Sequence, residues 1–192
     1  YPEFSKFGTI EVASGTFNLN YPLTLTQLNI AFGASFSTSN ELVISSIENN
    51  GDFSITSDLL ITKSLTNSGI FQAEKVYLEP VENEITITGQ SGDSSEIANK
   101  TKISELYCIN QAGKNLVINN AISVGKIALS GSSDNRLSII GNGIIYLETE
   151  CGDDENDIAQ YLNLDESSLP KIENQYITVS DGQFSSENND IF

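Results

Sequence analysis

The densest group of residues that could do chemistry is an acidic cluster near the C-terminal end of the sequence. Asp153, Glu155 and Asp157 match the first three oxygen ligands of an EF-hand calcium loop. The position that requires glycine holds Ile158, however, and the twelfth position, which requires a bidentate glutamate, holds Leu164. The EF-hand motif therefore fails. Two interpretations stay open: a looser carboxylate site for calcium, or the solvated first turn of a short helix.

Residues for acid–base or nucleophilic catalysis are scarce in the chain. It contains no histidine, so no serine has the usual base that would activate it, and Arg136 is the single arginine. Five acidic residues recur at no common spacing, which favours solvated outer positions over paired catalytic carboxylates aligned on one face. They are Glu41, Glu48, Asp52, Asp58 and Glu74. We predict that the protein is not an enzyme and needs no cofactor.

Length and charge restrict the domain count and the partners. The 192 residues, 39% of them hydrophobic, suit one core with appendages. A net charge of −17, from 9 Lys+Arg against 26 Asp+Glu, disfavours nucleic acid and anionic membranes as partners. No apolar run is long enough to span a bilayer. Because the chain lacks methionine and begins at Tyr1, we expect a processed or excised piece of a longer protein. We expect it to be monomeric and, from its composition, to lie outside the cell, at the cell surface or in the cell wall.

Glycine recurs at a fixed interval of eighteen residues in the first part of the chain. Gly15, Gly33, Gly51 and Gly69 mark the interval, and within three residues each is followed by a phenylalanine, namely Phe17, Phe36, Phe53 and Phe71. Gly113 and Gly131 are again eighteen apart, and a polar insertion at 89–96 accounts for the shift in phase before them. A period of this length is typical of solenoid repeats.

The residues between the glycines alternate as in β-strands, for example at 24–30 and 84–88. Large apolar residues recur at about a third of the period, which predicts three short faces per coil. The sequence therefore predicts a parallel β-helix of about 18 residues per coil, with about seven coils between Gly15 and Gly131. We prefer a right-handed coil because the apolar spacing drifts instead of following a strict hexapeptide.

Each repeated residue has an expected role in such a coil. Glycine would supply the positive φ of a corner, the phenylalanines would form an aromatic column in the core, and Asn49 and Asn67 would stack as an amide ladder. The solenoid should occupy residues 1–150. The remaining segment, 151–192, is acidic, and we expect it to cap the open end with a short helix after Asp153 and strands at 175–179 and 183–184.

Two further sites concern covalent modification. Cys108 and Cys151 fit either one disulfide or two buried thiols, and we predict the disulfide because the composition resembles that of exported proteins. Strict register would place the two on different faces, so the tail would have to fold back along the solenoid to form the bridge. The triplet from Asn99 to Thr101 predicts N-glycosylation of Asn99.

Two aligned lines, Ile47-Glu-Asn-Asn-Gly-Asp-Phe53 and Leu65-Thr-Asn-Ser-Gly-Ile-Phe71, carry a family resemblance. Together with the Gly-Ala-Ser stretch that ends at Phe36, they resemble the hyphally regulated cell-wall protein family over residues 10–150. That resemblance implies the N-terminal β-helix of a yeast GPI-anchored adhesin, which is non-catalytic, glycosylated and exposed at the cell surface. Its ligand would be a surface, a glycan or a protein.

Other classes of β-helix give alternative functions. The same sequence pattern of an asparagine, a glycine and an aromatic residue occurs in passenger domains of bacterial autotransporters, which gives a first alternative. A polysaccharide-active β-helix enzyme is the second and less favoured alternative. An ice-binding ladder of threonines is not predicted, because eighteen-residue spacing places Thr24 and Thr26 over Leu42 and Ile44.

Overall fold

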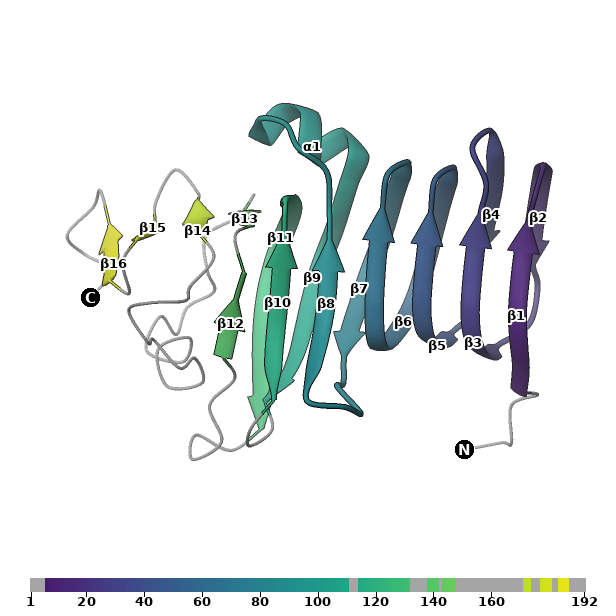
Figure 1. The fold of residues 1–192 in the computed structure, drawn as a ribbon, viewed down its shortest axis with the longest axis horizontal. Helices are drawn as coiled ribbons and strands as arrows, with labels where there is room; N and C mark the ends of the chain where they lie inside the picture. The colour runs from purple at the N-terminus through teal and green to yellow at the C-terminus, as the bar shows by residue number, and fades with distance from the viewer. Residues whose placement is uncertain are drawn as a thin grey trace.

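The computed structural model describes residues 6–110, 114–131, 138–141, 143–147, 171–173, 177–180 and 183–186. Most of them lie in strands that stack as a parallel β-solenoid of about 6 turns (Figure 1). The elements are β1 Lys6–Val12, β2 Gly15–Leu19, β3 Leu23–Ile30, β4 Ala34–Thr38, β5 Leu42–Asn49, β6 Asp52–Asn67, β7 Ile70–Leu78, β8 Glu84–Thr88, α1 Ser94–Lys100, β9 Thr101–Asn110, β10 Asn115–Asn119, β11 Ala121–Gly131, β12 Ser138–Ile140, β13 Ile144–Leu147, β14 Lys171–Glu173, β15 Ile177–Ser180 and β16 Gln183–Ser186.

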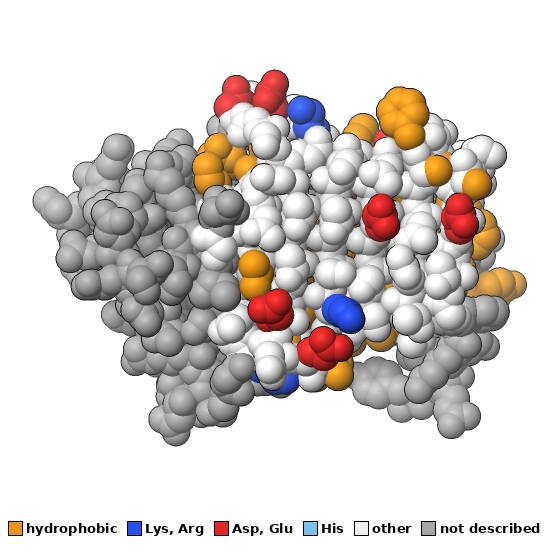
Figure 2. Space-filling model, viewed as in Figure 1, with side chains coloured by type: hydrophobic (Ala, Val, Ile, Leu, Met, Phe, Trp, Pro, Cys, Tyr) orange, Lys and Arg blue, Asp and Glu red, His pale blue; other side chains and the backbone are white. Residues whose placement is uncertain are grey.

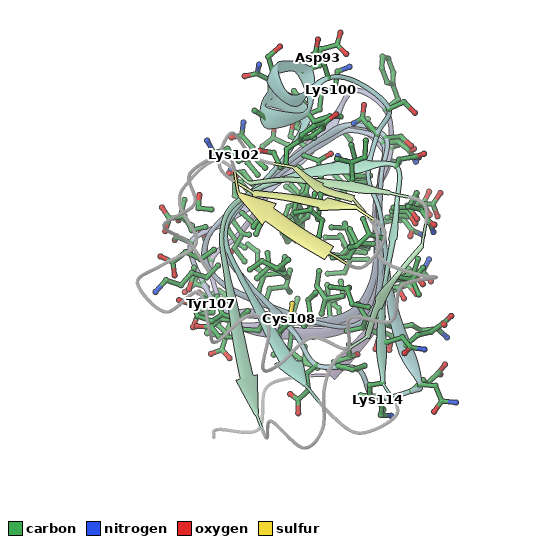
Figure 3. All side chains as sticks on the ribbon, turned by 90° about the vertical axis from the view of Figure 1, so that its left-hand side faces the viewer. Asp93, Lys100, Lys102, Tyr107, Cys108 and Lys114 are labelled. Atoms are coloured by element: carbon green, nitrogen blue, oxygen red, sulfur yellow. The ribbon has the colours of Figure 1, made fainter. Side chains whose placement is uncertain are left out.

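The solenoid is right-handed, as predicted. Figure 3 looks along the axis from the side on which the C-terminus lies in Figure 1. In that view the chain runs from Asp93 and Lys100 at the top, past Lys102 and Tyr107 on the left, to Lys114 at the lower right. It therefore turns counterclockwise while it advances toward the viewer, which defines a right-handed coil.

Each coil contributes one strand segment to each of three faces. Face A contains β2, β4, β13 and the first residues of β6, β7, β9 and β11. Face B contains the first residues of β3 and β5, the middle of β6 and the last residues of β7, β9 and β11. Face C contains the last residues of β1, β3, β5 and β6, and then β8, β10 and β12. All neighbours within these faces pair in parallel.

The coil length varies more than the glycine spacing predicts. It averages roughly 19 residues, and the prediction of about seven coils is too high by about one. Gly15 pairs with Ala34, one residue beyond the expected Gly33. Leu42 pairs with Leu59, one residue short of the expected Leu60, and the register shifts between Ile44 and Ser46. Irregular corners absorb such single residues without disturbing the faces, because a bulge adds a residue to one strand only.

The second pair of glycines is not in phase, which is a correction to the predicted register. Gly131 pairs with Asn110, so it does not stack on Gly113, which lies outside the described residues. Beyond the insertion the coils are simply longer: Lys102 pairs with Ser123. The eighteen-residue spacing of Gly113 and Gly131 therefore has no structural counterpart.

The predicted aromatic column is present in the core of face A. The rings of Phe17, Phe36, Phe53 and Phe71 stack in series, with centroid distances of 5.7, 5.6 and 4.7 Å. The last three rings are at most 1% exposed, whereas Phe17 at the first coil is 38% exposed. Aliphatic columns fill the rest of the interior on faces B and C. Continuous burial of this kind stabilises each coil against its neighbours.

The predicted amide ladder is also present at the corner between faces C and A. The Nδ2 atom of Asn49 donates to Oδ1 of Asn67 at 2.8 Å and to the carbonyl oxygen of Ile70 at 2.8 Å. Asn67 continues the chain of hydrogen bonds by donating to Oγ1 of Thr101 at 2.7 Å. The ladder begins at Asn49, because the preceding partner in register is Ile30, and Oδ1 of Asn49 has no hydrogen-bond partner.

The four repeated glycines serve two different purposes. Gly15 and Gly33 have φ of 72° and 75°, the corner conformation that was predicted for all four. Gly51 and Gly69 are required for close packing instead. A Cβ atom on Gly51 would lie 2.2 Å from the carbonyl oxygen of Ala34, and one on Gly69 would lie 1.9 Å from that of Gly51. The backbones of successive coils touch at this corner.

The inserted segment forms a helix where the sequence predicted only a polar loop. α1 begins after Asp93, whose carboxylate accepts from the backbone N–H of Glu96 at 3.0 Å. This hydrogen bond is the main reason why the pKa of Asp93 lies below its usual value, because it favours the ionised carboxylate. The fully buried Ile97 anchors the helix. The chain then re-enters face A in register, with Thr101 paired to Phe71.

The described part of the acidic segment continues the sheet. β14 pairs in parallel with β13, and β15 and β16 then pair antiparallel, which ends the coil geometry. The strands β15 and β16 lie where two strands were predicted. The predicted helix and the calcium candidates Asp153, Glu155 and Asp157 lie outside the described residues.

Candidate functional site

The predicted glycosylation site lies on α1. Asn99 is exposed, and its Nδ2 atom donates to the carbonyl oxygen of Ser95 at 2.8 Å. Thr101, the hydroxyl residue of the acceptor triplet, is fully buried and accepts from Asn67. The triplet is therefore half inside the folded structure, so a glycan on Asn99 would have to be attached before Thr101 is buried. Glycosylation stays a prediction.

Cys108 is a buried cysteine in the core of face B, and no other described residue is bonded to its sulfur. It is 1% exposed and stacks in register on Leu78. Burial raises the pKa of its thiol to about 12, because the apolar interior disfavours a thiolate. Cys151 lies outside the described residues, so the disulfide between the two stays a prediction.

Alkylation followed by mass measurement distinguishes the two states of the cysteines. If Cys108 and Cys151 are bridged, unfolded protein should take up no label without reductant and two labels with it. If both are thiols, two labels should appear without reductant. In that case native Cys108 should resist labelling at pH 8, since its raised pKa leaves almost no thiolate. Rapid labelling of Cys108 in the native protein would contradict its burial.

The outer surface of face B carries a half-buried apolar row that we call the tyrosine row. Its registered members are Thr24, Val43, Leu60, Tyr77 and Tyr107. The two tyrosine rings stack with centroids 4.7 Å apart and planes 11° apart. Each ring therefore covers one face of the other. The two tyrosines of this row thus pack against one another.

A registered column of alternating charge, namely Asp58, Lys75 and Glu105, runs beside the tyrosine row. The Tyr107 hydroxyl donates to Oε2 of Glu105. This hydrogen bond to the carboxylate, together with a smaller effect of desolvation and of the negative charge of Glu105, raises the pKa of Tyr107 to about 12.

We expect Glu105→Gln to lower the pKa of Tyr107 toward the ordinary tyrosine value of about 10, because the neutral amide no longer opposes the phenolate. In the wild type the native state holds this proton above the pH at which the unfolded chain loses it. The contribution of Tyr107 to stability is therefore complete below pH of about 10 and is lost toward pH 12. Ultraviolet titration of tyrosinate, referenced to Tyr107→Phe, measures the pKa. Glu48→Gln on face C is the control, and identical titrations of wild type and Glu105→Gln would contradict the assignment.

Face C carries two continuous outer rows, which we call the polar rows. The members of the first row are Thr9, Gln27, Ser46, Ser64, Thr86 and Val117. The members of the second row are Glu11, Asn29, Glu48, Thr66, Thr88 and Asn119. All twelve side chains are half-buried or exposed. The inward residues that alternate with them fill the core, which fixes the outward direction of the rows.

Uncharged polar groups dominate the polar rows. Only Glu11 and Glu48 are charged, and Val117 is the single apolar member. Figure 2 views the solenoid from the side of face C and shows a surface with few acidic or basic side chains over the strands. The eighteen-residue spacing hid these rows because it drew attention to Thr24 and Thr26, and Thr24 lies on face B. The alternating triplets 64–66 and 86–88 carry the signal that could have revealed them.

Three observations complete the description of possible sites. Among the described residues, no group of three or more acidic, cysteine or histidine side chains is placed to hold a metal ion. Within the same part of the chain no helix has the length and apolarity to cross a membrane. No model of a known protein family, no curated protein and no solved structure matches the chain. The fold thus defines the class of protein, a right-handed parallel β-solenoid.

Proposed function

We propose that this chain is a non-catalytic attachment module of an adhesin or cell-wall protein, exposed outside the cell. The observation that carries the proposal is the pair of polar rows on face C. They repeat one kind of chemistry over successive coils, so they offer an extended and uniform surface instead of a single reaction centre. Repeat architectures commonly bind their partners on such surfaces.

The residues behind the resemblance to hyphally regulated cell-wall proteins have structural roles. Phe53 and Phe71 belong to the aromatic column, Asn67 to the amide ladder, and Gly51 and Gly69 to the tight corner. The resemblance therefore bears on the construction of the coil. The attachment role rests on the outer surface of face C, which those residues hold in place.

Retention of coated particles under flow tests the proposal. Beads that carry the whole chain should stay attached to at least one of several surfaces, namely polysaccharide films, protein films, cells and plastic, at a shear that removes passivated beads. A reducing-end assay on the polysaccharides should detect no cleavage. Retention on no surface, or turnover of a polysaccharide at catalytic protein concentrations, would refute the proposal. An anchor signal in the precursor would distinguish a cell-wall protein from a bacterial passenger domain.

A further inference from the structure

We infer that the polar rows on face C bind an uncharged polysaccharide; this inference rests on the proposed attachment function and names its ligand class. The first step is the charge of the surface. The chain carries −17 overall, yet ten of the twelve side chains in the polar rows are uncharged. An anionic polymer would be repelled by the whole protein, and a cationic one would find more carboxylates elsewhere. A neutral ligand suits this face.

The hydrogen-bonding capacity of the polar rows also suits a sugar. Hydroxyl and amide side chains both donate and accept, as the hydroxyl groups of a sugar do. Few of these groups are used internally: Oγ of Ser64 donates to Oγ of Ser46 at 3.0 Å, and Nε2 of Gln27 donates to Oδ1 of Asn29 at 2.9 Å. The hydroxyls of Thr66 and Thr88 make no hydrogen bond within the described residues. They are available to a ligand.

The side chains of the polar rows are preorganised for a ligand that repeats along its length. Strand pairing holds equivalent side chains of successive coils about 4.8 Å apart, so the rows present donors and acceptors at a constant spacing along the axis. The β-branched side chains of Thr66, Thr86 and Thr88 have few rotamers to lose on binding. A ligand that also repeats along its length, such as a polymer of sugars, can therefore form many weak hydrogen bonds at little cost in side-chain entropy.

A protein ligand fits this face poorly. Protein interfaces have a core depleted of charge and enriched in aromatic and apolar residues. The polar rows contain one apolar member, Val117, and no aromatic one. The apolar character that a protein partner requires is found instead on the tyrosine row of face B, where the two rings each cover one face of the other.

Binding isotherms with insoluble neutral polymers test the inference. The probes are cellulose, chitin and β-1,3-glucan, with alginate as the anionic comparison. We expect the whole chain to bind at least one neutral polymer, and the double variant Thr66→Val/Thr88→Val to bind it about tenfold more weakly through the loss of its hydrogen bonds. Valine keeps the size and β-branching of threonine, so the fold should be unaffected. The matched control is Thr16→Val/Thr24→Val, which removes one exposed and one half-buried hydroxyl from faces A and B.

The outcomes separate this inference from the proposed function. A selective loss of binding in Thr66→Val/Thr88→Val, unchanged by added salt, supports the assignment. Equal losses in both double variants, no loss in either, or binding to alginate alone would overturn it. If coated beads attach to other surfaces while no neutral polymer is bound, the ligand class is wrong and the attachment function stands. If the protein shapes ice crystals and binds no neutral polymer, the polar rows bind ice and the polysaccharide assignment is wrong. If the beads attach to nothing, both proposals fail.

Discussion

Gly69→Ala should destabilise the protein by about 3–5 kcal/mol, the range of the most disruptive single substitutions. The added Cβ atom would lie 1.9 Å from the carbonyl oxygen of Gly51 and 2.8 Å from the backbone carbon of Asn50. Neither neighbour is a side chain that can rotate away, so two coils would have to separate at the corner. The midpoint of urea unfolding, followed by circular dichroism, measures the effect.

Gly15→Ala is the matched control for this prediction. Gly15 has φ of 72° but nothing within 4 Å of its added Cβ atom. The substitution should therefore cost only the strain of a left-handed conformation, about 1–2 kcal/mol. Equal losses in the two variants would mean that backbone conformation, and not contact between coils, explains the glycine at both corners.

The second large effect is expected from Phe53→Ala, which removes the middle of the aromatic column. Phe53 is 1% exposed and stacks on Phe36 at 5.6 Å and on Phe71 at 4.7 Å. Truncation leaves a cavity lined by two rings that are held by their own strands, so we expect a loss of about 3–5 kcal/mol in the free energy of unfolding. Thermal or urea unfolding measures the loss.

Phe17→Ala tests whether position in the column sets the cost. Phe17 has one stacking neighbour and is 38% exposed, so its truncation should cost about 1–2 kcal/mol. Phe53→Leu should lie between the two, because leucine refills part of the cavity. A loss for Phe17→Ala as large as that for Phe53→Ala would contradict the view that burial within the column dominates.

The interior of the solenoid was predictable from the sequence because its core repeats chemistry. Phe36, Phe53 and Phe71 recur with the period, and so do Asn49 and Asn67, since each coil needs the same group at the same place. Alternation within each face then predicts which neighbours point outward. These features fix the fold class, the parallel pairing and the approximate coil length.

The exact register was not predictable, for a physical reason. A corner can take up one more or one fewer residue without changing the faces, so Thr24 pairs with Val43 and not with Leu42. Counting eighteen residues therefore placed outer residues on the wrong neighbours and hid the polar rows. The helix α1 left a signal that was missed: Asp93 followed by Glu96 three residues later is a capping-box pattern.

Stacked coils have a mechanical consequence for a chain that is pulled from its two ends. In Figure 1, β1 lies toward one end of the solenoid and β13 toward the other, so tension would act along the axis. Each coil occupies about 4.8 Å of that axis. It contains roughly 19 residues, which extend to about 65 Å when stretched. Because a coil contacts only its neighbours, coils can detach one after another, and each release lengthens the tether more than tenfold relative to the folded coil. The coil that contains α1 would release the longest segment.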